Sequence, residues 1–172
     1  LKAILQTAEA VGFSSVAVAD HIVVPAAIES SYPYTVKGEF ISKGDALEQL
    51  TLMAFVAAAT ESLRIVSSVM IVPHRNPIVS AKSIATTDML SEGRVTVGVG
   101  VGWMAEEFAA LDTADFTKRG AVTDEYIRIW KKLWTGEAVS YQGEFYSFEE
   151  LYCQPAPTQR PHPPIWVGGA SE

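Results

Sequence analysis

The sequence predicts an α/β fold built from parallel strands and the helices that connect them. Helix-like segments precede and separate the strand-like ones, and strands joined in this way run parallel through right-handed crossovers. The run LRIVSSVMIV, residues 63–72, is apolar almost throughout, as is typical of a strand buried on both faces of a parallel sheet. The chain has 172 residues, of which 48% are hydrophobic and 19% charged. This composition excludes disorder and allows one domain with a substantial core.

The first quarter of the chain predicts a helix, a short strand and a long loop. Residues 1–12 place apolar side chains at helical spacing and end in a glycine suited to the position after a helix. Residues 14–20, SSVAVAD, are a β-branched run too short for a helix. Residues 21–44 contain two prolines and no sustained period. Long loops of this kind are often functional.

Two further helices flank the apolar strand. We expect the helix before it to begin at Asp45, with Glu48 three residues later completing a capping box. The helix after it has Asn76 as its N-cap and Pro77 in its first turn, and it closes at Gly93. The run RVTVGVGVG, which follows Gly93, predicts the next strand.

The remaining part predicts more helices and a β-hairpin. A short helix runs to about Leu111, and a longer one spans residues 119–136 and ends in a glycine. Residues 138–148 alternate polar and apolar side chains around Gln142–Gly143, as a hairpin does. A proline-rich connector and a final strand from Pro164 complete the chain.

Charge and cysteine content exclude several classes of protein. The net charge of −7 argues against a general binder of nucleic acids or anionic membranes, which needs clustered Lys and Arg. The single cysteine, Cys153, excludes a disulfide framework, and we expect it to be a small, semi-buried side chain. The three histidines lack metal-ligand spacing, so we expect no metal. Without a signal peptide or a membrane-spanning apolar run we expect a soluble, cytoplasmic protein, and the start at Leu1 hints at a fragment.

Three alternating glycines, Gly98, Gly100 and Gly102, raise the question of a dinucleotide site. The G-x-G-x-x-G fingerprint is incomplete because Trp103 interrupts it. The acidic residue expected about twenty residues later is also missing, and basic residues stand there instead. Two interpretations stay open. The glycines let the strand approach another part of the protein closely, or they leave room for a ligand, which is the interpretation we favour.

Polar side chains follow the predicted strands at their carboxyl ends, where active sites of parallel α/β folds gather. Asp20 and His21 end one strand, and histidine can move a proton near neutral pH. The alternative is a capping aspartate and a surface histidine. His74 follows the next strand, and the hydroxyl groups of Ser67–Ser68 within it need hydrogen-bond partners or a ligand.

Two more motifs carry weaker signals. The stretch Gly168-Gly169-Ala170-Ser171 follows the last strand, where its backbone N–H groups either cradle a phosphate or form a plain tight turn. Trp130 and Trp134 stand at helical spacing, which indicates packing residues rather than site residues.

The motifs taken together resemble a known family. They are GFSSVAVADH, HRNP, ATTDMLSEGRVTVGVGVGW, RGAVTDEYIRIWKKLW, GEFYSFE and RPHPPIWVGGAS. In this order, and over essentially the full length, they resemble the luciferase-like monooxygenase superfamily, and most closely its branch of probable coenzyme F420-dependent oxidoreductases.

The resemblance implies a (β/α)8 barrel whose C-terminal mouth binds a flavin or the deazaflavin F420. Residues 1–172 would then form one domain that supplies strands two to five of the barrel. The first strand would precede Leu1, and the last three would follow Glu172. The hairpin at about 137–148 would be the family's insertion between strands four and five.

The resemblance also implies roles for individual residues. Asp20 is similar to the position that contacts the deazaflavin ring, and His21 to the histidine proposed to take the substrate proton in an F420-dependent sugar-phosphate dehydrogenase. The remaining cofactor positions are Ser68–Val69, which resembles a non-prolyl cis peptide behind the ring; Gly100 and Gly102, which pass under the cofactor; and Gly168 and Gly169, near its phosphate tail.

Trp103 stands where that dehydrogenase has a glutamate acid, so the acid role and the sugar substrate do not transfer. Trp103 is instead a predicted substrate-pocket residue.

Three functional hypotheses follow. The first is an oxidoreductase that transfers a hydride between F420 and an organic small molecule. The second is an FMN-dependent monooxygenase of the same fold. The third is an inactive barrel fragment that self-associates, because half a barrel leaves open sheet edges. We expect a homo-oligomer.

Overall fold

The computed structural model describes residues 1–169 and contains a five-stranded sheet whose paired strands are all parallel. Its strands are β1 (Ser15–Val18), β2 (Arg64–Ser67), β3 (Met70–Ile71), β4 (Val95–Gly100) and β7 (Ile165–Val167). The order is β1-β2-β4-β3, and β7 also pairs with β4. β2 lies against the start of β4, and β3 lies against its end. β2 and β3 are therefore two pieces of one interrupted strand.

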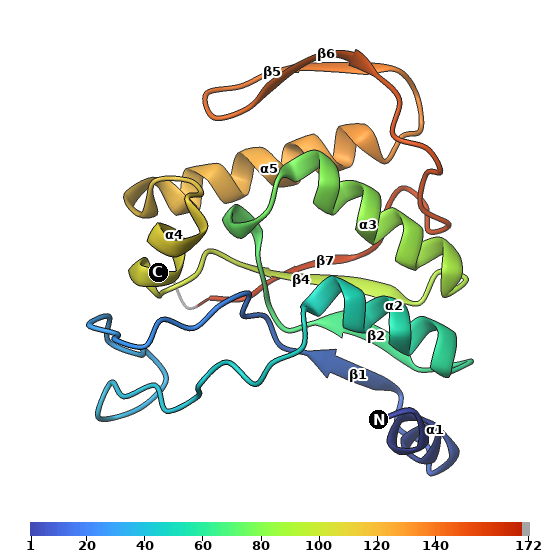
Figure 1. The fold of residues 1–172 in the computed structure, drawn as a ribbon. Coiled ribbons are helices and arrows are strands. Elements are labelled where there is room, and N and C mark those ends of the chain that lie inside the picture. The colour runs from blue at the N-terminus through green and yellow to red at the C-terminus, as the bar shows by residue number, and fades with distance from the viewer. Residues whose placement is uncertain (170–172) are drawn as a thin grey trace.

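Helices cover one face of this sheet (Figure 1). The helices are α1 (Lys2–Ala10), α2 (Gln49–Ala59), α3 (Pro77–Leu90), α4 (Ala105–Leu111) and α5 (Arg119–Leu133), with 3₁₀ turns at Val72–His74 and Phe116–Lys118. α2, α3 and α5 lie along the same side of the strands, whereas α4 and the loop after β1 gather at the strands' carboxyl ends (Figure 1). The predicted alternation of helices and parallel strands is confirmed. No helix within residues 1–169 is long and apolar enough to cross a membrane.

Two local predictions need correction. α2 begins at Gln49, and its N-cap is Glu48, whose carboxylate accepts from the Thr51 N–H at 2.7 Å. The helix therefore does not start at Asp45, because Glu48 itself supplies the capping acceptor. The apolar run 63–72 is not one continuous strand, because β2 ends at Ser67 and β3 begins at Met70. The peptide bond between Ser68 and Val69 is cis, so the non-prolyl cis peptide that the resemblance implied is confirmed.

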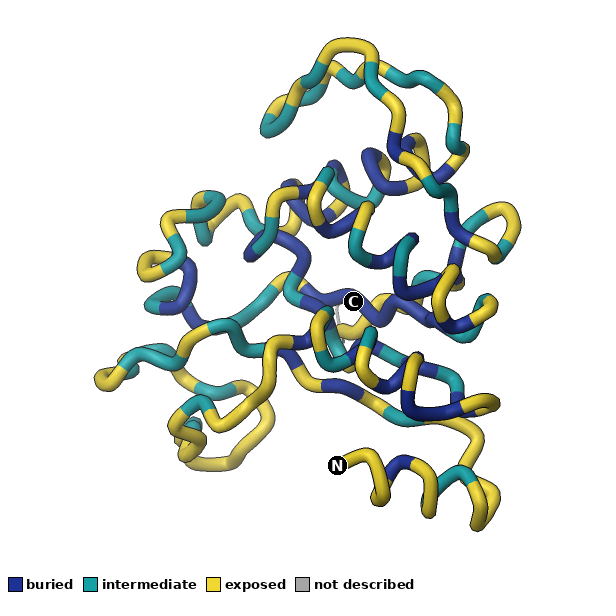
Figure 2. The backbone as a smooth tube through the Cα atoms, turned by 45° about the vertical axis from the view of Figure 1, so that its right-hand side comes forward, coloured by how far each residue is buried: buried dark blue, intermediate teal, exposed yellow. Residues whose placement is uncertain are grey.

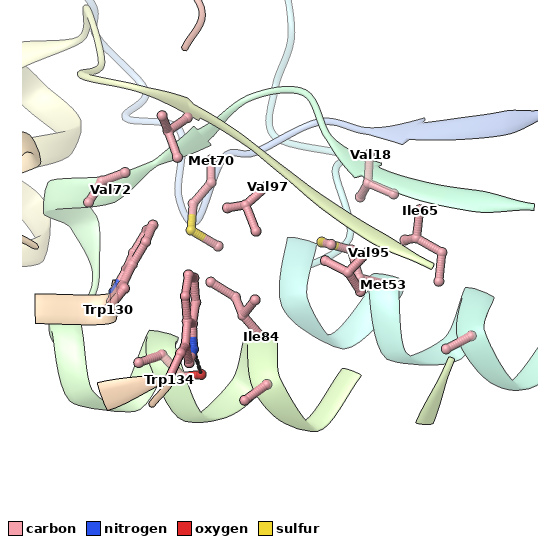
Figure 3. Close-up of a cluster of buried hydrophobic side chains, with 14 of the residues drawn as sticks. Val18, Met53, Ile65, Met70, Val72, Ile84, Val95, Val97, Trp130 and Trp134 are labelled. Carbon is pink, nitrogen blue, oxygen red and sulfur yellow. Dashed lines mark hydrogen bonds between the residues drawn. The ribbon is translucent and has the colours of Figure 1, made fainter. Parts of the chain in front are cut away.

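The hydrophobic core lies between β4 and the helices. Every residue of β4 is buried, and in Figure 2 dark blue marks buried residues in the middle of the molecule and along the inner sides of the helices. Its valines pack with Ile84 of α3, with Trp130 of α5 and with Trp134, the C-cap of α5 (Figure 3). The indole N–H of Trp134 donates to the carbonyl of Ala81 at 3.0 Å, so the polar edge of the ring is satisfied. Both tryptophans are packing residues, as their spacing predicted. Cys153 is also buried in this core.

The predicted hairpin forms from β5 (Val139–Gln142) and β6 (Ser147–Leu151), which pair antiparallel. It lies outside α5, at the top of Figure 1. Its turn spans residues 143–146 rather than centring on Gln142–Gly143. The buried Glu125 of α5 accepts backbone N–H bonds from Glu144, Phe145 and Tyr146 at 2.8–3.0 Å. This carboxylate fixes the turn, and with it the hairpin, to the helix.

Candidate active site

A cavity of about 530 Å³ opens at the carboxyl ends of β1, β3, β4 and β7. We call it the strand-end pocket. It is lined by the nine residues that the resemblance assigns to catalysis, the cofactor or the substrate, namely Asp20, His21, Ser68, Val69, Gly100, Gly102, Trp103, Gly168 and Gly169. Segments far apart in the chain thus meet at one place. This was expected because their residues stand at the carboxyl ends of the strands. The individual roles of these residues stay predictions.

Asp20 is held by an arginine that the sequence analysis did not single out. Nη1 and Nη2 of Arg75 each donate to one oxygen of the Asp20 carboxylate at 2.7 Å. The backbone N–H of Ile71 donates to the same carboxylate at 2.8 Å. Arg75 also donates to Glu48 at 2.8 Å, ahead of α2. A bidentate pair of this kind fixes geometry, so Asp20 joins the end of β1 to β3 and α2.

His21 is oriented by Glu107 of α4. Its Nδ1 lies 2.9 Å from Oε2 of the carboxylate. The other oxygen of Glu107 accepts from the backbone N–H groups of Ile22 and Val23 at 2.8 and 3.3 Å. Burial raises the pKa of Glu107, but the His21 bond, the neighbouring His74 and the backbone donors outweigh it, and the pKa is lowered overall. An ionised carboxylate can only accept hydrogen bonds. A neutral His21 therefore carries its proton on Nδ1, and its Nε2 is free to accept a proton.

His74 lies on the other side of the same carboxylate. Its Nδ1 is 3.9 Å from Oε1 of Glu107, which is too long for a hydrogen bond. The ring packs edge-to-face on Phe108, with the centroids 4.5 Å apart. Burial lowers the pKa of His74, and the nearby Glu107 and Asp20 only partly oppose this effect. The lowered pKa favours the neutral form of the imidazole.

The glycines of β4 allow the Ser67–Val69 segment to approach closely. A Cβ atom on Gly98 would collide with the carbonyl oxygen of Ser67, and one on Gly100 would lie 2.7 Å from a methyl carbon of Val69. The Ser67 hydroxyl donates to the Gly98 carbonyl at 2.9 Å, so this hydroxyl has the hydrogen-bond partner that a polar group inside an apolar strand requires. Close approach thus explains Gly98 completely. Gly100 also borders the strand-end pocket, so there both interpretations of the glycine pattern apply.

The long loop after β1 brings aromatic rings over the pocket. Trp103 contacts Tyr32 and Phe40, with ring centroids 5.0 and 5.2 Å apart, and Phe40 lies 5.0 Å from the ring of His21. Glu106 secures the loop by accepting bonds from the N–H and hydroxyl groups of Ser30 at 2.8 and 2.7 Å. These hydrogen bonds lower the pKa of Glu106 to about 2, and the bond from the Ser30 hydroxyl has the largest effect. The adjacent Glu106 and Glu107 therefore hold two different points of the loop.

A family model described as luciferase-like monooxygenase matches residues 1–172. The chain belongs to this family. It is 36% identical over 126 residues to an FMNH(2)-dependent dimethylsulfone monooxygenase of Pseudomonas putida, covering 72% of this chain and 34% of that protein. It is 37% identical over 169 residues to an uncharacterized protein of Mycobacterium tuberculosis, covering 97% of this chain and 58% of that protein.

Solved structures of luciferase-like fold agree with this membership. The monooxygenase RslO1 from Streptomyces bottropensis superimposes with a TM-score of 0.79 at 27% identity, covering 96% of this chain and 45% of that one. An F420-dependent secondary alcohol dehydrogenase in complex with an F420-acetone adduct superimposes with a TM-score of 0.75 at 23% identity, covering 98% of this chain and 46% of that one. At this identity the likeness supports the fold alone. The chain spans between a third and three fifths of the length of these relatives. Its sheet is accordingly a partial (β/α)8 barrel.

Sequence reasoning missed Arg75 and Glu107. Arg75 stands in the HRNP motif, which was interpreted only as a helix start. Glu106 and Glu107 were both near the site in sequence, and only the rotation of α4 decides which carboxylate faces His21. Arg119, which was not predicted either, borders the pocket and donates to the Gly102 carbonyl at 3.1 Å. Of the predicted phosphate cradle, Ala170 and Ser171 lie outside the described residues.

Proposed function

We propose that the protein is an oxidoreductase whose strand-end pocket binds the deazaflavin F420 and transfers a hydride between it and an organic small molecule. The observation that carries the proposal is the His21–Glu107 pair, whose 2.9 Å contact holds a proton-accepting imidazole on the wall of the pocket. Membership of the luciferase-like monooxygenase family supports redox chemistry at this position.

The residues of the pocket fit a flat ring system with a polar edge and an anionic tail. The cavity of about 530 Å³ lies within the usual range for small-molecule sites, roughly 300–1,000 Å³. Val69 and Ile71 give it an apolar wall, and the buried His74 provides ring nitrogens that lack a partner among residues 1–169. A Cβ atom on Gly169 would meet no atom of residues 1–169 within 4 Å, so this part of the chain leaves space beside that glycine.

These features support a placement of the cofactor in the pocket. Ser68, Val69 and Gly100 would lie against the ring, with Gly168 and Gly169 toward the phosphate tail. Arg119 is the cation best placed to receive negative charge, because Arg75 is already paired with Asp20 and Glu48. The carboxylate of Asp20 is occupied by Arg75 and Ile71, so Asp20 would shape the site rather than supply a free charge.

A bound deazaflavin or flavin supplies the two-electron chemistry, and the chain supplies orientation and proton transfer. Oxidation of an alcohol releases a hydride from carbon and a proton from the hydroxyl group. Nε2 of His21 would accept that proton, because Glu107 keeps Nδ1 as the donor. In the reverse direction, the same nitrogen returns the proton. Such general acid–base steps contribute about 10²–10⁴-fold to rates.

Titration of the purified protein with F420 and with FMN tests the proposal. We expect F420 to bind, as measured by absorbance and fluorescence, and its reduction by a donor substrate to be insensitive to oxygen. Replacing His21→Ala should preserve cofactor binding and slow turnover by about 10²-fold or more. Turnover equal to that of the unaltered protein would remove the proton role from His21. Binding of neither cofactor would show that the proposed function is wrong.

An FMN-dependent monooxygenase is the second candidate function. The 36% identity to the FMNH(2)-dependent dimethylsulfone monooxygenase favours it. The same titration separates the two, because a monooxygenase would bind FMN and consume oxygen, whereas the F420 enzyme would do neither.

A further inference from the structure

His74 is a buried histidine whose ring nitrogens have no hydrogen-bond partner among residues 1–169. It lies in the 3₁₀ turn between β3 and α3, and its side chain is only 1% exposed. The other two histidines differ from it. Nδ1 of His21 contacts Glu107 at 2.9 Å, and Nδ1 of His162 contacts the Pro163 carbonyl at 2.8 Å. Buried polar groups are almost always paired, so this exception calls for an explanation.

The neighbouring acceptors are already used. Oε1 of Glu107 lies 3.9 Å from the imidazole and accepts two backbone N–H bonds, while Oε2 contacts His21. The carboxylate of Asp20 receives Arg75 and the Ile71 N–H. Phe108 covers one side of the ring. The open side of His74 is the strand-end pocket, which it lines. A partner for its nitrogens would therefore lie in that pocket, as a ligand or a water molecule.

We propose that His74 is a ligand-binding residue whose imidazole hydrogen-bonds the polar edge of the bound flavin or deazaflavin ring. The inference rests on the proposed function, which places such a ring in this pocket. F420 and FMN share a pyrimidinedione edge with carbonyl acceptors and an N–H donor. A neutral imidazole offers one donor and one acceptor, so it complements this edge in either orientation.

Replacing His74→Phe tests the proposal, because phenylalanine keeps the ring that packs on Phe108 and removes only the nitrogens. The ligand-free variant should melt at the same temperature as the unaltered protein or above it, since no hydrogen bond of the free protein is lost. Its Kd for the cofactor that the unaltered protein binds, F420 or FMN, should rise about threefold to tenfold. The matched control His162→Phe loses a hydrogen bond far from the pocket, and its Kd should not change.

A measurement on the unaltered protein avoids dependence on a variant that fails to fold. With ¹⁵N-labelled histidine, adding F420 or FMN should move the imidazole ¹⁵N signals of His74 and leave those of His162 in place. Static His74 signals at saturating cofactor, or an unchanged Kd in His74→Phe, would overturn the inference while the proposed function stands. Failure of the unaltered protein to bind either cofactor would instead overturn the proposed function, and the role of His74 with it.

Discussion

Glu107 is the side chain on which the proposed chemistry of the pocket depends. Its carboxylate is 1% exposed and joins the ring of His21 to the first residues of the long loop. A carboxylate buried to this extent would ordinarily gain a proton, but the donors around it lower its pKa instead. It therefore stays an acceptor near neutral pH and fixes which nitrogen of His21 carries the proton.

Replacing Glu107→Gln should lower kcat by about 10²-fold with little change in cofactor affinity. The amide oxygen can still accept from the Ile22 N–H, so the loop keeps its anchor. The amide N–H₂ group would then face Nδ1 of His21 and favour the tautomer with its proton on Nε2, which can no longer accept one. Steady-state kinetics together with cofactor titration measures both effects.

The adjacent Glu106→Gln is the matched control, because Glu106 contacts the loop at Glu29 and Ser30 and does not touch His21. It should leave kcat within about twofold of the unaltered protein. A comparable loss of kcat in both variants would mean that loop anchoring, and not the orientation of His21, accounts for the effect of Glu107.

The interrupted strand β2–β3 shows what local sequence patterns can and cannot predict. Periodicity and glycine positions predicted the helices, the parallel strands and the hairpin, because each depends on residues close in the chain. The break at Ser68–Val69 could not be predicted from the local pattern, since the two serines interrupt the apolar run without indicating a cis peptide. It was expected only from resemblance to the luciferase-like family. Contacts such as His21–Glu107 join residues 86 positions apart, and no spacing rule reaches that far.

The close packing of β2 on β4 makes Gly98 indispensable. Replacing Gly98→Ala should destabilise the protein by roughly 1–3 kcal/mol, because the added methyl group meets the backbone oxygen of Ser67 rather than a side chain that can move. In a chain of this length that is a fall in Tm of several degrees. Gly120→Ala in α5 is the matched control, since its Cβ would meet nothing within 4 Å and alanine favours a helix. An equal Tm for both variants would contradict the close approach of the two strands.

The sheet as a whole leaves apolar surface exposed on the side that the helices do not cover. Ala17, Val66 and Trp166 border a second hollow there, and Trp166 is 57% exposed. Figure 2 shows that exposed residues also dominate α1, at the N-terminal end of the chain. Ile4 and Phe13 are 70% and 63% exposed at this end. Apolar areas of this kind mark surfaces that another chain or segment covers.

The exposed face leads us to predict that the 172-residue chain self-associates. Its mass is 18.6 kDa, and size-exclusion chromatography with light scattering should give at least twice that value. Trp166→Lys places a charge on the uncovered face and should shift the population toward the monomer. Tyr152→Lys alters an aromatic side chain that is 72% exposed just beyond the hairpin strand β6, and it should leave the mass unchanged. A chain that is monomeric and binds cofactor would contradict the prediction, because the pocket would then be complete without a second copy.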